Sequence, residues 1–229
     1  MPNVPQPKRH PYDQWSPDAR ALDLVGDKWT LLIIRDLAAG PRRFVELQRV
    51  LPGISTEQLR SRLNRMVADG MLTRKRYREV PPRVEYTLTE RASELMPVLA
   101  QLARWGYEWA WSAPRESEAV DVGAIFRLAP GLVDPEGISG TVELEVEDGE
   151  ERSCYSFTIS SDGVELEECE ARRADARVRG KLRAWVSALS PDRNRDGLEI
   201  SGNHRLAERL LGGLVAENAP HGQHARAAA

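Results

Sequence analysis

The sequence predicts an α+β protein in two parts: a helix-rich first half with one basic hairpin, and a small α+β second half with a mainly antiparallel sheet. Three observations support this prediction. Apolar residues recur at helical spacing through much of residues 16–112. Within residues 42–83 there are 11 Lys and Arg against 4 Asp and Glu, a net charge of +7 in a chain of net charge −3. Between residues 141 and 170 apolar and charged side chains alternate, which is the period of a half-buried strand.

Length and composition are those of a globular protein. The chain has 229 residues, of which 41% are apolar and 29% charged, enough for two modest domains. No apolar run approaches the roughly 20 residues that cross a bilayer, so we expect no membrane partner. Residues 1–15 are Pro-rich and lack the apolar segment of a secretory signal. We therefore expect a flexible N-terminal arm on a cytoplasmic protein.

Three short helices are predicted at the start of the first half. Ser16 before Pro17 is typical of an N-cap and a first helical position, and this helix runs to residue 26. A second helix covers about residues 27–40, where Gly-Pro ends it. A third covers residues 43–51, and Pro-Gly follows it.

The segment 55–69, STEQLRSRLNRMVAD, carries the clearest helix signal. Ser55 with Gln58 three residues later forms a capping-box pattern. Apolar residues recur from Leu59 to Val67, so one side of this helix can dock on the other helices. The opposite side of the helical wheel carries Glu57, Gln58, Ser61, Asn64 and Arg65, with Arg60 and Arg62 on its flanks.

A basic hairpin and a long helix are expected next. Two β-like runs flank a Pro-Pro turn, and the first run is rich in Arg and Lys. A single long helix then begins near Thr89, its cap, and continues to Trp109. We place the first domain at residues 16–113 and a linker at 114–120.

These elements in this order are typical of a winged helix-turn-helix that binds DNA. The 55–69 helix can dock by its apolar side while presenting polar side chains to a major groove about 12 Å wide. The basic hairpin can contact phosphates or the neighbouring minor groove. Charge alone would favour the alternative, a solvated helix beside a charged edge hairpin. The order of the elements, the capped helix and the basic window together favour DNA binding.

Residues 16–112 also resemble the HxlR-type (MarR-like) winged-helix regulators. The segments GDKWTLLIIRDL, PRRF, PGIS and PPRVEY-x-LT occur in that family's order. The resemblance implies a homodimer, joined by the first and last helices of the domain, that represses or activates at an inverted-repeat site in double-stranded DNA. It also implies that the 55–69 helix is the recognition helix and 73–87 the wing.

The expected DNA contacts fall into two groups. Recognition-helix contacts are Thr56, Gln58, Arg60, Ser61, Arg62, Asn64 and Arg65. Wing and phosphate-backbone contacts are Arg42, Arg43, Arg74, Lys75, Arg76, Arg78 and Arg83.

The cysteines and tryptophans are interpreted as structural residues. Many members of the resembled family carry a cysteine, used by some as a thiol sensor, where this chain has Ser16, so sensing at that position is not expected. Cys154 and Cys169 flank a predicted hairpin turn and could face each other, although two separate strand thiols are favoured in a reducing compartment. Trp29 and Trp105 are expected in the core or a dimer interface.

The second half is expected to form an α+β domain over residues 121–216, with a disordered tail at 217–229. Strands are predicted at 141–147, 153–160 and 164–170, near 176–178 and at 198–200, and helices at 182–189 and 206–214. The end of this half resembles sterol carrier protein-like domains, with Gly202, Leu206, Ala207 and Leu210 matching their ending. That resemblance implies a pocket for a small apolar effector, with Phe157, Ile159, Trp185, Leu189 and Leu211 as lining candidates; the alternative is that each simply fills the core.

Two competing functions remain open. A lipid or small-molecule carrier could use the winged helix chiefly to dimerise, and strong salt dependence of duplex binding would separate it from a regulator. An enzyme is not expected, because the sequence has no HExxH, GxGxxG or P-loop motif and no paired nucleophile and base. Asp192, Asp196 and His204 fall in a short polar stretch that is explained as a loop. No metal or other cofactor is expected.

Overall fold

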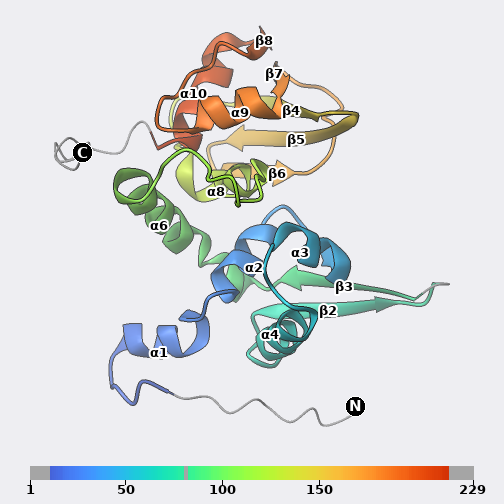
Figure 1. The fold of residues 1–229 in the computed structure, drawn as a ribbon, viewed down its shortest axis with the longest axis vertical. Helices are drawn as coiled ribbons and strands as arrows, with labels where there is room; N and C mark the ends of the chain where they lie inside the picture. The colour runs from blue at the N-terminus through green and yellow to red at the C-terminus, as the bar shows by residue number, and fades with distance from the viewer. Residues whose placement is uncertain (1–10, 80–81, 217–229) are drawn as a thin grey trace. The chain divides into compact units, whose positions relative to one another are not determined.

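The structure, a computed structural model, describes residues 11–79 and 82–216, and the chain forms two compact units (Figure 1). The first unit ends at Leu95 and the second begins at Met96. The expectations for the tail at 217–229 and for most of the N-terminal arm lie outside the described residues.

The first unit is a winged helix-turn-helix. Its three strands form one antiparallel sheet in the order β1-β3-β2, in which Tyr86 pairs with both Arg42 and Arg74. Strand β1 contributes only two residues to it. The elements are α1 (Pro17–Val25), α2 (Thr30–Leu37), β1 (Arg42–Arg43), α3 (Phe44–Val50), α4 (Thr56–Ala68), β2 (Leu72–Tyr77), β3 (Arg83–Leu88) and α5 (Glu90–Ser93).

The apolar stripes predicted from spacing form the core of this unit. The α4 helix buries its stripe, and α2 and α3 also bury large apolar side chains that are at most 2% exposed. Burying such aliphatic side chains stabilises the unit by about 1.5–3 kcal/mol each. The core residues of the three helices are Ile33, Ile34, Leu37, Leu47, Leu59, Leu63 and Met66.

The single long helix expected from Thr89 to Trp109 is wrong. The structure has α5, capped by the Thr89 side chain, and then a separate helix α6 (Met96–Trp109). Pro97 explains the break: inside a continuous helix its ring would clash with the carbonyl of Ser93 and remove a hydrogen bond. At the second residue of α6, the missing N–H has no intrahelical partner to lose. The boundary between the two units coincides with this break.

The second unit is an α+β domain with a five-stranded sheet in the order β6-β5-β4-β7-β8. Three of its pairings are antiparallel, as expected, while β4 and β7 are parallel, which the sequence did not indicate. The predicted strands and the two later helices are present, but short helices at the start of the domain were missed. The elements that follow α6 are α7 (Gly123–Phe126), α8 (Ala129–Leu132), β4 (Gly140–Asp148), β5 (Glu151–Ser160), β6 (Gly163–Glu167), β7 (Ala176–Lys181), α9 (Leu182–Leu189), β8 (Leu198–Gly202) and α10 (His204–Leu214).

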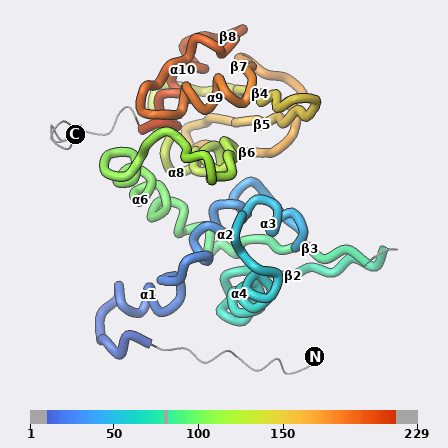
Figure 2. Tube along the Cα trace, in the orientation of Figure 1, coloured from blue at the N-terminus to red at the C-terminus, as the bar shows by residue number. Residues whose placement is uncertain are grey.

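Helices cover one face of this sheet. Both α9 and α10 pack against β4 and β7 (Figure 2). At the centre, Trp185 is fully buried and its indole N–H donates to the Glu145 carbonyl oxygen at 2.8 Å. The Phe126 ring meets the rings of Trp185, Phe157 and Tyr155 edge-on, at centroid distances of 5.1, 6.2 and 5.0 Å.

The other face of the sheet carries a ladder of ion pairs. Glu143 and Glu145 are only 4% exposed although they lie on the charged side of β4. Glu143 accepts from Arg177 at 3.0 Å, and Glu145 contacts Arg179 at 3.1 Å and Arg152 at 2.6 Å. The long arginine side chains cover the carboxylates and keep these buried charges paired.

One side of α6 is fixed to the rest of the second unit. The Tyr107 hydroxyl donates to the Leu214 carbonyl oxygen at 2.8 Å, and Arg104 donates to that of Leu132 at 3.0 Å. Just beyond the helix, the Trp111 indole N–H donates to the Leu189 carbonyl oxygen at 2.9 Å. The Leu99 side chain is buried on the same side. This helix is therefore an integral part of the second unit.

Candidate nucleic-acid interface

Helix α4 begins where the capping-box pattern predicts. The Ser55 hydroxyl accepts from the Gln58 backbone N–H at 3.2 Å, and the Gln58 side chain accepts from the Ser55 N–H at 3.1 Å. This cap fixes the first turn of the helix. With its apolar side buried, α4 exposes Thr56, Gln58, Arg60 and Ser61 in its first two turns.

Two of these exposed side chains already have partners. Gln58 is held in the cap, and the Thr56 hydroxyl accepts from the Gln48 side-chain amide at 2.8 Å. The Thr56 contact links α4 to α3 across the turn between them. Arg60 is 60% exposed and has a loose ion pair with Glu57 at 3.4 Å, so its guanidinium can reorient toward a ligand.

The expected contacts further along α4 are less exposed. Asn64 and Arg65 are half-buried. Arg62 has a side chain only 20% exposed and forms an ion pair with Asp27 at 2.9 Å. Asp27 in turn accepts from the backbone N–H groups of Trp29 and Thr30 at the start of α2. Arg62 therefore fastens α4 to the beginning of α2.

The wing is the β2–β3 hairpin. Successive side chains on β2 alternate between its two faces, so Arg74 and Arg76 share one face while Lys75 and Tyr77 share the other. On that second face, the Lys75 ammonium and the Arg83 guanidinium lie 4.9 and 4.2 Å from the centroid of the Tyr77 ring. These cation–π contacts order the basic side chains at the tip end of the hairpin. Arg78, just past β2, is exposed.

The two arginines before α3 differ in their surroundings. Arg43 is exposed and lies 4.0 Å from Glu46. The Arg42 side chain instead donates to the Asp36 carbonyl oxygen at 2.6 Å. The Asp36 carboxylate is fully buried and receives two hydrogen bonds from Arg35, at 2.9 and 3.0 Å. Arg42 thus braces the end of α2 against the short strand β1.

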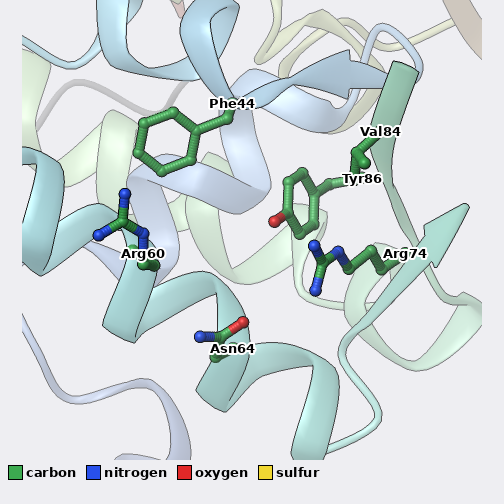
Figure 3. A pocket seen from close by; sticks show the side chains of 6 residues that line it. All are labelled: Phe44, Arg60, Asn64, Arg74, Val84 and Tyr86. Carbon is green, nitrogen blue, oxygen red and sulfur yellow. The ribbon is translucent and has the colours of Figure 1, made fainter. Parts of the chain in front are cut away.

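A pocket of about 290 Å³ lies between α4 and the wing (Figure 3). Three of its side chains, Arg60, Asn64 and Arg74, are expected DNA contacts. The three apolar or aromatic side chains of the pocket were not predicted from the sequence. Strand pairing could have placed Tyr86 beside Arg74, but nothing local in the sequence brings Phe44 to them. The lining side chains are Phe44, Arg60, Asn64, Arg74, Val84 and Tyr86.

The residues expected to line an apolar effector pocket lie in the core of the second unit. Each of the five is at most 3% exposed, and none lines the pocket beside α4. A groove of about 580 Å³ in this unit is lined by other residues, among them Val120, Leu182 and Val186. An apolar effector in this unit stays a prediction from resemblance.

Across residues 11–79 and 82–216, no group of three or more His, Cys, Asp or Glu side chains is placed to hold a metal ion. In the same part of the chain, none of the helices has the length and apolar character needed to span a bilayer.

Comparison with known proteins agrees with this geometry. Residues 24–113 match the HxlR-like helix-turn-helix family. An uncharacterized HTH-type transcriptional regulator of Halalkalibacterium halodurans is 45% identical over 94 residues, which are 41% of this chain and 83% of that protein. Another, from Synechocystis, is 42% identical over 93 residues, 41% of this chain and 69% of that protein.

Solved structures give similar matches. The reduced form of the transcriptional regulator YodB from B. subtilis is 33% identical to this chain. The match covers 42% of this chain and 96% of the YodB chain, with a TM-score of 0.38. The two curated relatives are each more than 40% identical to this chain over at least two thirds of their own length. The chain therefore belongs to the HxlR-like helix-turn-helix family.

Proposed function

We propose that this protein is a transcription regulator that binds double-stranded DNA as a homodimer, with α4 as the recognition helix. The observation that carries the proposal is the exposed polar start of α4 beside a hairpin whose β2 strand carries Arg74, Lys75 and Arg76, all exposed. Its curated relatives are named as HTH-type transcriptional regulators, which supports the proposal.

The proposed contacts divide by their chemistry. Ser61, Arg60 and Asn64 on α4 have side chains that hydrogen-bond base edges, so they would read sequence in the major groove. Arg43 and Arg76 would contact phosphates, which adds affinity without adding sequence preference. We assign Arg62 and Arg42 a bracing role, because both are engaged with other parts of the first unit.

An exposed apolar stripe on α6 supports the homodimer. Val98, Leu102, Trp105 and Trp109 are spaced by four, three and four residues, so they share one face of the helix. They are 52%, 52%, 59% and 54% exposed in the single chain. The stripe faces away from the side of α6 that holds Leu99 and Tyr107, and a second copy of the chain would bury it. Two copies would place two recognition helices in successive major grooves about 34 Å apart, which fits an inverted repeat.

The test combines DNA binding with measurement of mass in solution. We expect fluorescence anisotropy to show selective binding to a duplex from the region upstream of the protein's own gene, weakening steeply with salt. Analytical ultracentrifugation should show a dimer. Trp105→Asp should give a monomer with much weaker DNA binding, whereas Val120→Asp, at an exposed apolar residue outside the stripe, should change neither. A dimeric Trp105→Asp would refute the α6 interface, and unselective binding at every salt concentration would refute the regulator.

A further inference from the structure

The carboxylate of Asp27, between α1 and α2, holds two parts of the first unit at once. Its Oδ1 atom accepts from the backbone N–H groups of Trp29 and Thr30 at 2.9 and 3.1 Å. Its Oδ2 atom accepts from the Thr30 hydroxyl and lies 2.9 Å from the Arg62 guanidinium of α4. One oxygen therefore caps the start of α2, and the other ties that start to the middle of the proposed recognition helix.

Polar contacts hold α4 at two points along its length. Thr56, its first residue, accepts from the Gln48 side-chain amide of α3 at 2.8 Å, and Arg62 follows six residues later. Six residues span about 9 Å of helix. The buried apolar stripe of α4 attracts its neighbours without a preferred direction, so it permits small rotations of the helix. Two directional contacts about 9 Å apart restrict both the tilt and the rotation of α4.

The orientation of α4 matters because its proposed base contacts surround Arg62 in the sequence. Arg60, Ser61 and Asn64 all lie within two residues of it. A rotation of about 10° moves a side chain on the surface of a helix about 10–12 Å wide by about 1 Å. That displacement exceeds the range of about 0.5 Å over which donor–acceptor distances vary in good hydrogen bonds. Without the Asp27 contact, α4 would lose hydrogen bonds to base edges while keeping its positive charge.

Asp27 also restricts what Arg62 can bind. The two side chains are only 23% and 20% exposed, so a DNA phosphate that took Arg62 would leave a partly buried carboxylate without its cation. Arg62 is among the DNA contacts expected from the sequence, and the ion pair withholds its charge from phosphates, which carry no sequence information. We propose that Asp27 is a positioning residue that raises the sequence selectivity of α4, acting through Arg62 rather than by contacting DNA. This role rests on the proposed function of α4 as the recognition helix.

The first experiment measures the ion pair without DNA. A double-mutant cycle on the full chain combines Asp27→Asn, which keeps an oxygen for the α2 cap, with Arg62→Met, which keeps an unbranched apolar side chain. In chemical denaturation, the effects of the two substitutions on the unfolding equilibrium constant should be non-additive by about fivefold or more. Additive effects would show that the two side chains do not interact and would overturn the proposal.

The second experiment measures DNA binding by fluorescence anisotropy, with the selected duplex and a scrambled one. Asp27→Asn should lower the ratio of the two affinities by at least about tenfold, as expected for the loss of one base contact. Arg62, released from Asp27, can then contact phosphate, so the salt slope should steepen by up to about 0.9 per protomer. Arg62→Met should lower the same ratio but keep the parental slope, because Arg62 does not contact phosphate in the parent. Asp27→Glu keeps the charge and should retain part of the selectivity.

Asp23→Asn is the matched control. It removes the same charge from α1, where the Asp23 side chain is 10% exposed and lies 4.0 Å from Arg20, and it should leave the ratio of affinities unchanged. Parental selectivity in Asp27→Asn would show that the ion pair only stabilises the fold, and it would overturn the proposal while the regulator stands. A flatter salt slope in Arg62→Met would also overturn it, because Arg62 would then be a phosphate contact. If the parent selects no duplex, the regulator proposal fails and the selectivity role fails with it, whereas the unfolding cycle separates that result from a failure of the Asp27 contact itself.

Discussion

Replacing Arg76 by alanine should flatten the salt dependence of DNA binding by a predictable amount. Arg76 is exposed on β2, two residues beyond Arg74 on the same face of the wing. Each phosphate contact contributes about 0.9 to the slope of log affinity against log salt, so the two copies in a homodimer contribute about 1.8. Over a fourfold rise in salt, the parent should therefore lose about tenfold more affinity than Arg76→Ala does.

The measurement is fluorescence anisotropy at four salt concentrations with the selected duplex and a scrambled one. Arg76→Ala should weaken binding to both duplexes by similar factors, because a phosphate contact carries no sequence information. Arg173→Ala removes an exposed charge from the second unit and should leave the slope unchanged. If Arg76→Ala has the parental slope, or if only the selected duplex is weakened, the assignment of Arg76 to phosphate is refuted.

Three further predictions concern other parts of the chain. Ser55→Ala should lower the free energy of unfolding by about 1 kcal/mol in chemical denaturation, since the cap of α4 is lost; Ser112→Ala, at an exposed position outside the helices, is the control. Arg127 is 2% exposed and forms ion pairs with Asp121 at 2.7 Å and Glu168 at 2.6 Å. Arg127→Met should therefore lower the free energy of unfolding by about 2–4 kcal/mol in the same assay. A loss below about 0.5 kcal/mol would show that these ion pairs are dispensable. Burial raises the pKa of the Cys154 thiol, and burial together with a hydrogen bond to Glu167 raises the pKa of the Cys169 thiol. Iodoacetamide should therefore react more slowly with the folded chain than with the urea-unfolded chain near neutral pH, and equal rates would contradict this.

The raised thiol pKa values also set the sign of a pH effect. In the unfolded chain, Cys154 and Cys169 lose their protons at lower pH than in the folded chain. The unfolded state therefore binds fewer protons as pH rises through the ordinary thiol range, and stability falls over that range. Both thiols are free, and the β5–β6 pairing ends at Ser156 and Glu167, short of both cysteines.

Local sequence signals predicted the first unit well. The Ser55–Gln58 pattern located the start of α4, and apolar spacing identified the side of the helix that is buried. The error at Thr89–Trp109 is equally local: the apolar spacing continues through Pro97 and predicts one helix, while the proline ring interrupts it. Charge counting found the wing, because its cations are contiguous in sequence.

Non-local packing explains what the sequence did not reveal. Arg60 and Arg62 flank the same polar surface on a helical wheel, yet Arg62 pairs with Asp27 while Arg60 stays exposed. The wheel gives the direction of a side chain but not the position of its partner. In the second unit, alternation predicted the strand around Glu143 but not that parallel β7 would lie beside it and cover its carboxylate with Arg177. For the same reason the sequence did not predict the pocket, whose lining residues come from four separate elements, α3, α4, β2 and β3.

Helix α6 links the proposed dimer to the packing of the second unit. Its one side is committed to the second unit through Tyr107 and Leu99, and its other side exposes the apolar stripe of Trp105 and Trp109. A dimer formed on that stripe would join two second units directly, because α6 is part of their core packing. Any ligand that altered the packing of the second unit would then act on the dimer, and through it on the spacing of the two recognition helices. Such a ligand should therefore change the dimerisation constant.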